Sequence, residues 1–327
     1  MILETDTPVN NRSRGTALSV GSAVLFGTSG PLASAIMATG WTPVEVTNAR
    51  VVAAVVLLLP VVALVRPAAL RLRAKDFPLV FGLGLLGVAG TQLFFFVAVS
   101  RIPVSLAMLL EYVAPVLVAL WVRVFRKTRL RPMVWLGIGL AMVGLCMIAQ
   151  VWQGLRLDPL GFAAGLGSAV CTAGFYLLGE RGAEKHDPIG LATLSLLVGA
   201  ILISLIRPPW ALPSHLLGTR TDIGGAHPPV WLLIVLLAVF STVLAYLAGT
   251  VSLKSVSSAL ASVLGLIEPL VAAILAWLLL GQVLDLSQLV GGAVLLAGAV
   301  LVQLTSRTVV GPEPLIERSK TNTDRPA

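Results

Sequence analysis

Charged residues are scarce in this sequence: Asp, Glu, Lys and Arg together make up 12% of its 327 residues. Hydrophobic residues make up 57%, and the mean hydropathy is +0.95. A soluble globular domain carries roughly 25% charged residues, so this composition excludes that class. The long apolar runs instead predict an all-α protein that crosses a membrane many times.

Cysteine and catalytic motifs are also scarce. Cys146 and Cys171 each lie inside an apolar run and predict neither a disulfide framework nor a metal site. The sequence has no Walker-type phosphate loop, no HisGluxxHis motif and no cluster of cysteines and histidines. We therefore expect no catalytic residue, no bound metal and no cofactor, and ATP-driven transport is not encoded in this chain.

The net charge of +8 would suggest a nucleic-acid partner for a soluble protein. In a chain of this hydropathy it reflects the preference of Lys and Arg for cytoplasmic loops, so we expect a lipid bilayer around the chain and no nucleic-acid partner. A homodimer is compatible with the sequence but is not indicated by it.

Ten apolar runs predict ten membrane helices, five in each half of the chain. They cover approximately residues 16–38, 45–65, 77–99, 103–124, 132–151, 160–180, 188–206, 229–251, 256–280 and 286–305. We expect disordered tails over 1–14 and 306–327, and two five-helix repeats over 15–152 and 158–305.

The two halves resemble each other. The run 103–126 has Pro115 where the run 257–280 has Pro269, an offset of 154 residues. At the same offset Gly137 and Gly144 match Gly291 and Gly298. The shared order of these matches indicates an internal duplication.

The positions of Lys and Arg predict the orientation. If both termini are cytoplasmic, eighteen of the 23 basic residues fall on the cytoplasmic side, which the positive-inside rule favours. Because each repeat has an odd number of helices, the second must be inverted relative to the first. Inverted repeats are typical of secondary transporters, whose substrate site lies near the bilayer midplane.

The run 257–280 carries the most informative residues. Glu268 lies in its middle, where a carboxylate costs several kcal/mol unless it is neutral, solvated or paired. Pro269 follows directly and removes a backbone donor, so we expect kinks at Pro269 and Pro115.

The pattern as a whole resembles the EamA-type, ten-helix exporters of the drug/metabolite transporter superfamily over residues 15–305. The resemblance rests on Gly27-Thr28-Ser29, Thr42-Pro43-Val44-Glu45 with Arg50, Pro115, Glu268-Pro269 and the run from Ala276 to Gly281. The chain departs from the family pattern at Phe26-Gly27, Arg126-Lys127 and Gly281-Gln282. These departures leave the fold intact but argue against transferring a particular substrate.

The resemblance implies a transporter of small metabolites in the cell membrane, often an exporter of amino acids or related compounds. Its transport is driven by a proton gradient or runs as facilitated efflux. Alternating access around a central cavity is the implied mechanism. A non-transporting scaffold or a lipid-interacting accessory protein is the alternative, and an enzyme would need a convergent set of reactive groups that the sequence lacks.

Three charged residues are candidates for substrate binding or coupling, each with a structural alternative. Glu268 and Glu111 could carry protons, or could be neutral acids that satisfy backbone near the prolines. Arg50, placed at the outer end of the second helix, could bind a substrate carboxylate. It could equally reach the membrane interface or pair within the protein, and Asn48 shares this uncertainty.

Polar and aromatic residues elsewhere could line the cavity or bond neighbouring helices together. Ser168, Thr172 and Tyr176 recur every four residues and so share one helix face. The remaining candidates are Thr28, Gln92, Tyr112, Tyr246 and Ser262.

Overall fold

The structure is a computed structural model, and it describes residues 8–71, 73–102, 104–127, 130–150, 158–281 and 285–307. Over these residues the chain is helical, with no β-strand and two isolated β-bridges between residues 220 and 229. Within these described ranges, nine helical segments are long and apolar enough to cross a membrane, and Pro132–Ile148 is apolar but shorter. This confirms the prediction of an all-α, multi-pass membrane protein with about ten membrane helices.

The first half of the chain supplies five membrane crossings. The first crossing consists of α1 Pro8–Gly27 and α2 Ser29–Met37, and the second of α3 Pro43–Val65. The third consists of α4 Phe77–Gly84, η3 Leu85–Gly90 and α5 Thr91–Val99. The fourth consists of α6 Val104–Glu111 and α7 Ala114–Val124, and the fifth of α8 Pro132–Ile148.

The second half supplies five more. They are α9 Pro159–Lys185, α10 Pro188–Ile206, then α11 Val230–Ala238 with η7 Val239–Leu244 and α12 Ala245–Ser252, then α13 Ser258–Gly265 with α14 Ile267–Leu280, and finally α15 Leu286–Arg307. Because five crossings separate the starts of the two halves, the second half runs inverted. We call the side of the membrane where α1 begins and α15 ends the terminal side.

The first helix begins earlier than the sequence predicted. Residues 8–14 belong to α1, although they were expected to be part of a disordered tail. Pro8 is the first residue of α1, a position that proline favours because its backbone nitrogen has no helical partner to lose there. Residues 1–7 and 308–327, the rest of the two predicted tails, lie outside the described residues.

Two irregularities recur at the same offset as the sequence matches. The fourth crossing is interrupted at Tyr112–Val113 and the ninth at Leu266, in both cases shortly before a proline. The π-helical turns η3 and η7 also begin 154 residues apart, at Leu85 and Val239. The duplication therefore extends to local departures from helix geometry.

Pro115 and Pro269 lie just after these interruptions, in the first turns of α7 and α14. A proline in the first turn costs little, because the amide it lacks would have no intrahelical partner. The chain thus places each proline where a new helical segment starts.

The first and sixth crossings, by contrast, differ. The chain breaks at Thr28 between α1 and α2, whereas α9 continues without interruption over 27 residues. At the break the Thr28 amide donates to the Leu25 carbonyl at 3.2 Å, and its hydroxyl donates to the same oxygen at 2.7 Å. The apolar run 16–38 had predicted one continuous helix.

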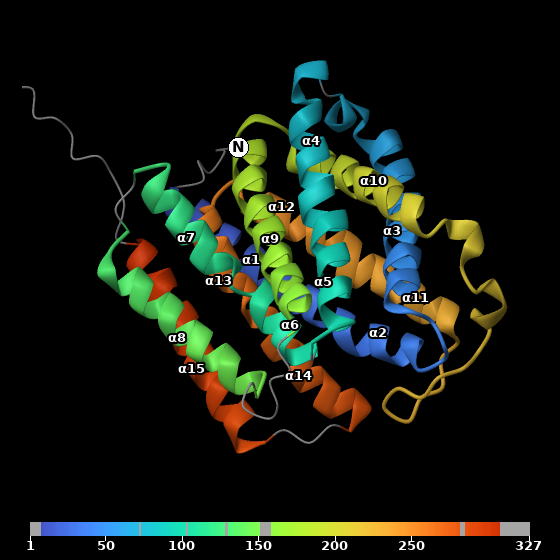
Figure 1. Ribbon diagram of the computed structural model, residues 1–327. Coiled ribbons are helices and arrows are strands. Elements are labelled where there is room, and N and C mark those ends of the chain that lie inside the picture. The colour runs from blue at the N-terminus through green and yellow to red at the C-terminus, as the bar shows by residue number, and fades with distance from the viewer. Residues whose placement is uncertain are drawn as a thin grey trace, which may run out of the picture.

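Helices α8 and α15 lie side by side at one edge of the bundle (Figure 1). Their contact is made by glycines. A Cβ atom added at Gly298 would lie 2.5 Å from the amide nitrogen of Ala141 and 2.5 Å from the carbonyl oxygen of Gly137. Small residues of this kind let two membrane helices approach closely, which gains van der Waals contact along their length.

Replacing Gly298 with alanine is therefore expected to destabilise the protein by about 1–3 kcal/mol, because the methyl group would meet backbone atoms that cannot move aside. Gly139→Ala on α8 is the matched control, since a Cβ there has nothing within 4 Å. That control should leave stability unchanged or raise it, because alanine favours a helix over glycine. Thermal unfolding in detergent measures both, and equal melting temperatures for the two variants would contradict the close contact.

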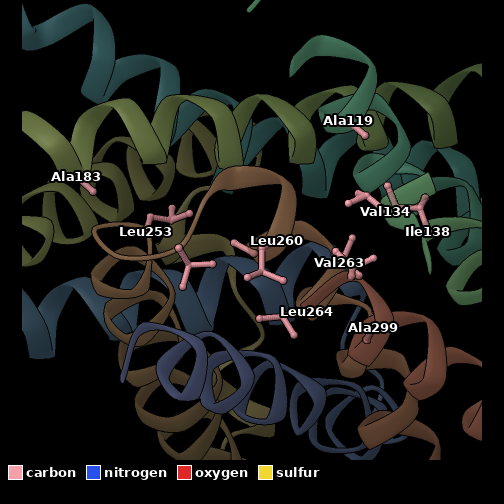
Figure 2. Close-up of a cluster of buried hydrophobic side chains, with 12 residues drawn as sticks. Ala119, Val134, Ile138, Ala183, Leu253, Leu260, Val263, Leu264 and Ala299 are labelled. Carbon is pink, nitrogen blue, oxygen red and sulfur yellow. The ribbon is translucent and has the colours of Figure 1, made fainter. Parts of the chain in front are cut away.

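A cluster of buried apolar side chains surrounds α13 on the terminal side. Figure 2 shows Leu260 and Leu264 of α13 in the middle of this cluster, with Leu253 to one side and Val134 and Ile138 of α8 to the other. Because α1, α9 and α15 also pack against α13, this part of the ninth crossing is held on several sides. The cluster fixes the terminal half of the crossing that carries Glu268.

Candidate functional site

A half-open cavity of about 130 Å³ lies between the two repeats near the middle of the helices. Both halves of the chain contribute to its wall: Phe26, Ser29, Arg50, Gly87, Thr91, Gln92 and Glu111 come from the first half, and Thr172, Phe175, Tyr176, Tyr246 and Glu268 from the second. The cavity thus gathers residues that lie up to 242 positions apart in sequence, from Phe26 to Glu268.

Three ionisable side chains face this cavity, one basic and two acidic. Arg50 comes from α3, Glu111 from the last residue of α6, and Glu268 from the first turn of α14. Both carboxylates are half-buried. The Nε atom of Arg50 is buried and has no hydrogen-bond partner, so this guanidinium retains an unused donor.

Arg50 was expected at the outer end of its helix, but the structure places it further inside. α3 begins at Pro43, and Arg50 is seven residues further along, roughly 10 Å into the helix at 1.5 Å per residue. The helix starts early because of a capping box: the Thr42 amide donates to Glu45 at 2.9 Å, and the Glu45 amide donates to the Thr42 hydroxyl at 3.4 Å.

Glu45 and Asn48 anchor the outer end of α3 rather than the cavity. The Arg207 guanidinium donates to Glu45 at 2.7 Å, and the side-chain amide of Asn48 donates to the carbonyl of Arg207. Arg207 follows the end of α10, so these contacts join the second crossing to the seventh. Asn48 is fully buried and does not line the cavity.

A group of aromatic rings forms one wall of the cavity. The ring of Tyr246 lies 5.1 Å from that of Phe26 and 5.8 Å from that of Phe175, and Phe175 lies 5.7 Å from Tyr176, all in edge-on arrangements. These separations are typical of favourable aromatic pairs. We call Phe26, Phe175, Tyr176 and Tyr246 the aromatic wall.

The π-helical turn η3 links this wall to the first repeat. The Tyr246 hydroxyl donates to the carbonyl of Gly87 at 2.8 Å. The wider turn leaves carbonyl groups without their usual partners, and the Thr91 hydroxyl supplies one by donating to Leu86 at 2.8 Å. Thr242 does the same in the second repeat, donating to Leu237 at 3.1 Å next to η7.

Seven of the predicted site residues line the cavity: Arg50, Gln92, Glu111, Thr172, Tyr176, Tyr246 and Glu268. Ser168 shares a face with Thr172 and Tyr176, but its hydroxyl donates to the Thr91 carbonyl at 3.1 Å and it is fully buried. This residue joins the sixth crossing to the third.

The other predicted residues also contact neighbouring chain rather than the cavity. Thr28 shares a 2.6 Å hydrogen bond with Ser241, and the Ser262 hydroxyl donates to the Ala259 carbonyl at 3.0 Å. Tyr112 lies at the break between α6 and α7 and does not line the cavity.

Of the other five cavity residues, Ser29 belongs to the Gly27-Thr28-Ser29 motif, and four were not singled out from the sequence as site residues: Phe26, Gly87, Thr91 and Phe175. An aromatic residue inside an apolar run gives no signal that separates a cavity-facing ring from a lipid-facing one. Gly87 lies in a glycine-rich stretch, which predicts close packing without saying against what. A Cβ at Gly87 would overlap the ring of Phe175, so glycine is needed for that ring to lie where it does.

A charged network joins three crossings on the terminal side. Glu180 of α9 accepts from Arg126, just beyond α7, at 2.5 Å, and from the amide and hydroxyl of Ser258 at 3.1 and 3.0 Å. Glu180 is 8% exposed. The network therefore ties the fourth, sixth and ninth crossings together where α13 begins.

Replacing Glu180 with glutamine should lower the stability of the protein by about 1.5–3 kcal/mol, since hydrogen bonds to a charged group contribute about that much. Thermal unfolding in detergent tests this, with Glu184→Gln as the control because Glu184 is exposed one turn further along α9. Identical melting temperatures for the two variants would show that the network contributes nothing to stability.

The described residues contain no group of three or more His, Cys, Asp or Glu side chains that could hold a metal ion. The site is instead a charged and aromatic cavity between two inverted helical repeats. An arrangement of this kind in a multi-pass protein defines a membrane transport protein.

The comparisons with known proteins agree. The model of the EamA-like transporter family matches residues 13–150 and 159–304, so the chain belongs to the EamA-like transporter family. It is a multi-pass cell-membrane transporter of small molecules and not an enzyme.

Two similar proteins illustrate the range of relatives. The threonine/homoserine exporter RhtA of Escherichia coli K12 is 28% identical over 251 residues, which cover 75% of this chain and 78% of RhtA. The uncharacterized transporter YdfC of Bacillus subtilis is 26% identical over 230 residues, or 70% and 72% of the two chains. A crystal structure of a protein that is 22% identical in sequence superposes with a TM-score of 0.72. The match covers 92% of this chain and 100% of the chain in the crystal structure, which supports the fold.

Proposed function

We propose that this protein exports amino acids or related small amphiphiles from the cell by alternating access, in exchange for protons. The observation that carries the proposal is the cavity in which Arg50, Glu111 and Glu268 lie beside an aromatic wall. An amino acid carries a carboxylate and an ammonium group on one carbon atom, and this cavity offers a partner of opposite charge for each.

Arg50 is the proposed partner of the substrate carboxylate. A guanidinium can donate two parallel hydrogen bonds to a carboxylate, and the buried Nε of Arg50 has a donor to spare. Glu111 and Glu268 are the proposed partners of the ammonium group. The aromatic wall would take the apolar part of the substrate, and its faces would also favour a nearby cation.

The proposed proton exchange follows from competition between the substrate ammonium group and a proton for the Glu268 carboxylate. A carboxylate that accepts a hydrogen bond from the ammonium group must be ionised, and a protonated carboxyl group loses that attraction. Binding of a proton would therefore favour release of the substrate, and binding of the substrate would favour release of the proton. The two half-helices that flank each break, α6 with α7 and α13 with α14, are the proposed moving parts.

The size of the cavity bears on the substrate. A half-open cavity of about 130 Å³ is small for a ligand site, which favours a small amino acid over a bulky one. The name of the relative RhtA refers to threonine and homoserine, so these two compounds are the first candidates for this chain. We also propose that the terminal side is cytoplasmic, because most Lys and Arg residues fall there.

Transport in proteoliposomes tests the proposal. Purified protein would be reconstituted and screened with radiolabelled threonine, homoserine, larger amino acids and non-amino-acid amphiphiles, with and without an imposed pH gradient. We expect flux of small amino acids that the gradient accelerates.

The outcomes are distinct. Flux of amino acids that ignores the gradient would support facilitated diffusion and overturn the proton exchange. Flux restricted to compounds without an ammonium group would overturn the proposed roles of Glu111 and Glu268. No flux of any compound, from protein shown to be folded, would favour the scaffold alternative.

A further inference from the structure

A second, smaller cavity lies on the terminal side of the aromatic wall. Its volume is about 30 Å³, and its polar lining consists chiefly of hydroxyl groups, from Ser19 and Ser22 of α1 and Ser252 of α12. At its far end are Ser252 and Leu253, the last residue of α12 and the one that follows it. We call this the inner cavity and the one that contains Arg50 the outer cavity.

The inner cavity is much smaller than the outer one. Its volume of about 30 Å³ exceeds the roughly 10–15 Å³ that a cavity needs to hold one water molecule, and the outer cavity is about four times larger. Its polar lining also suits water. The Ser22 hydroxyl donates to the Ala245 carbonyl and the Ser252 hydroxyl to the Gly249 carbonyl, each at 2.7 Å. Both oxygens therefore keep lone pairs that can accept from a water molecule.

The two cavities share one ionisable acid. The residues that line both are Phe26, Phe175, Tyr176, Tyr246 and Glu268. The four aromatic residues border both spaces, whereas Glu111 and Arg50 line only the outer cavity. Among the described residues Glu268 is thus the single carboxylate that reaches both cavities.

Other charged and titratable groups surround Glu268 on every side. They are Arg50 from α3, Glu111 from α6, Tyr112 from the break before α7, Tyr176 from α9 and Tyr246 from α12. Of these, only the two tyrosines Tyr176 and Tyr246 also line the inner cavity. A proton on Glu268 can therefore leave toward the terminal side only past hydroxyl groups and water.

We propose that Glu268 and a water molecule in the inner cavity form a proton path, so that the protein conducts protons across the membrane even without substrate. A hydronium ion in the outer cavity gives its proton to the Glu268 carboxylate and becomes water. The carboxyl group then passes this proton to the water of the inner cavity, which becomes hydronium and leaves toward the terminal side, and the carboxylate is regenerated. No bond other than O–H forms or breaks, and no oxidant or reductant is needed.

This inference rests on the proton-carrying role proposed for Glu268, but its test needs no substrate. Proteoliposomes would enclose a pH-sensitive dye, with potassium and valinomycin to hold the membrane potential at zero. A pH gradient of about one unit would be imposed with no solute present, and the rate of internal pH change recorded. Protein-free vesicles give the background rate.

We expect the wild-type protein to raise the proton flux several-fold above background and Glu268→Gln to return it to background. Glu184→Gln is the matched control, because Glu184 is exposed at the end of α9 and lies apart from both cavities. It should conduct protons as the wild type does.

Two further variants test the inner cavity itself. Ser22→Val replaces a lining hydroxyl with two methyl groups, and Gly249→Ala places a Cβ 2.9 Å from the Ser22 oxygen. Each should reduce the proton flux several-fold, and size-exclusion chromatography would show which variants are folded. Using two variants guards against misfolding of either one.

The proposal is overturned if wild-type flux equals background, or if Glu268→Gln conducts as the wild type does. Undiminished flux in both folded inner-cavity variants would also overturn it, since the path would then run elsewhere. A protein that shows gradient-driven amino-acid transport but no flux without solute would retain the proposed function and lose only this inference. A protein that conducts protons but transports no solute would retain this inference and lose the proposed function.

Discussion

Replacing Glu268 with glutamine is expected to abolish the accumulation of substrate against its gradient. A pH difference of one unit is worth about 1.4 kcal/mol per proton, which sustains about a tenfold ratio of substrate concentrations across the membrane if one proton is exchanged. Glutamine keeps the size of the side chain but cannot release a proton. The ratio at steady state should therefore fall from about ten to about one, while substrate exchange without a gradient continues.

The measurement is the steady-state ratio of a radiolabelled amino acid in proteoliposomes at a fixed pH difference. Glu184→Gln again serves as the control and should retain the wild-type ratio. If Glu268→Gln retained the wild-type ratio too, Glu268 would be a structural acid that hydrogen-bonds to backbone groups at the break in the ninth crossing. Glu111 would then become the candidate for the proton carrier.

Replacing Arg50 with alanine is expected to weaken substrate binding with little effect on folding. Hydrogen bonds to a charged group contribute about 1.5–3 kcal/mol, so the apparent affinity should fall by about 10- to 150-fold. Folding should change little because the buried Nε of Arg50 has no hydrogen-bond partner to lose. The Michaelis constant for amino-acid flux in proteoliposomes reports this loss.

Arg50→Lys separates charge from geometry. Lysine keeps the positive charge but lacks the planar pair of donors, so it should restore only part of the affinity. An amine that lacks a carboxylate should bind the wild type and Arg50→Ala alike. Equal loss for such an amine would contradict the assignment of Arg50 to the substrate carboxylate and would indicate a general role in shaping the cavity.

Much of the architecture was predictable from the sequence because its signals are local. Membrane helices are read from continuous apolar runs, and the duplication from prolines and glycines in the same order. The break at Thr28 was missed although Pro31 lies in the first turn of α2, as Pro269 lies in the first turn of α14. The break also involves a Thr28 hydroxyl that bonds backwards to Leu25 and across to Ser241, and the second bond needs the folded bundle.

The position of Arg50 shows a second limit. A hydropathy pattern ends a helix near its first charged residues, which placed Arg50 at the membrane surface. The Thr42–Glu45 capping box sets the true start, and its spacing was readable in the sequence. What the sequence could not reveal is that Glu45 is held by Arg207, a residue 162 positions away, while Arg50 lines the cavity with Glu111 and Glu268.

The composition of the cavity wall was the least predictable part. Ser168, Thr172 and Tyr176 share a helix face as expected, yet the first of them bonds to backbone and the other two reach the cavity. Which part of a face meets open space depends on how neighbouring helices are rotated. Phe26 and Phe175 entered the site for the same reason, since their rotation about the helix axis is set by packing.

The uninterrupted α9 and the divided first crossing bear on the alternating access proposed above. In a perfectly symmetric pair of inverted repeats, openings toward the two faces of the membrane would be equivalent motions. Here the first crossing is divided at Thr28, whereas its counterpart α9 is continuous over 27 residues. In the proposed motion the two openings would therefore be inequivalent, and substitutions at Thr28 would act on the first repeat alone.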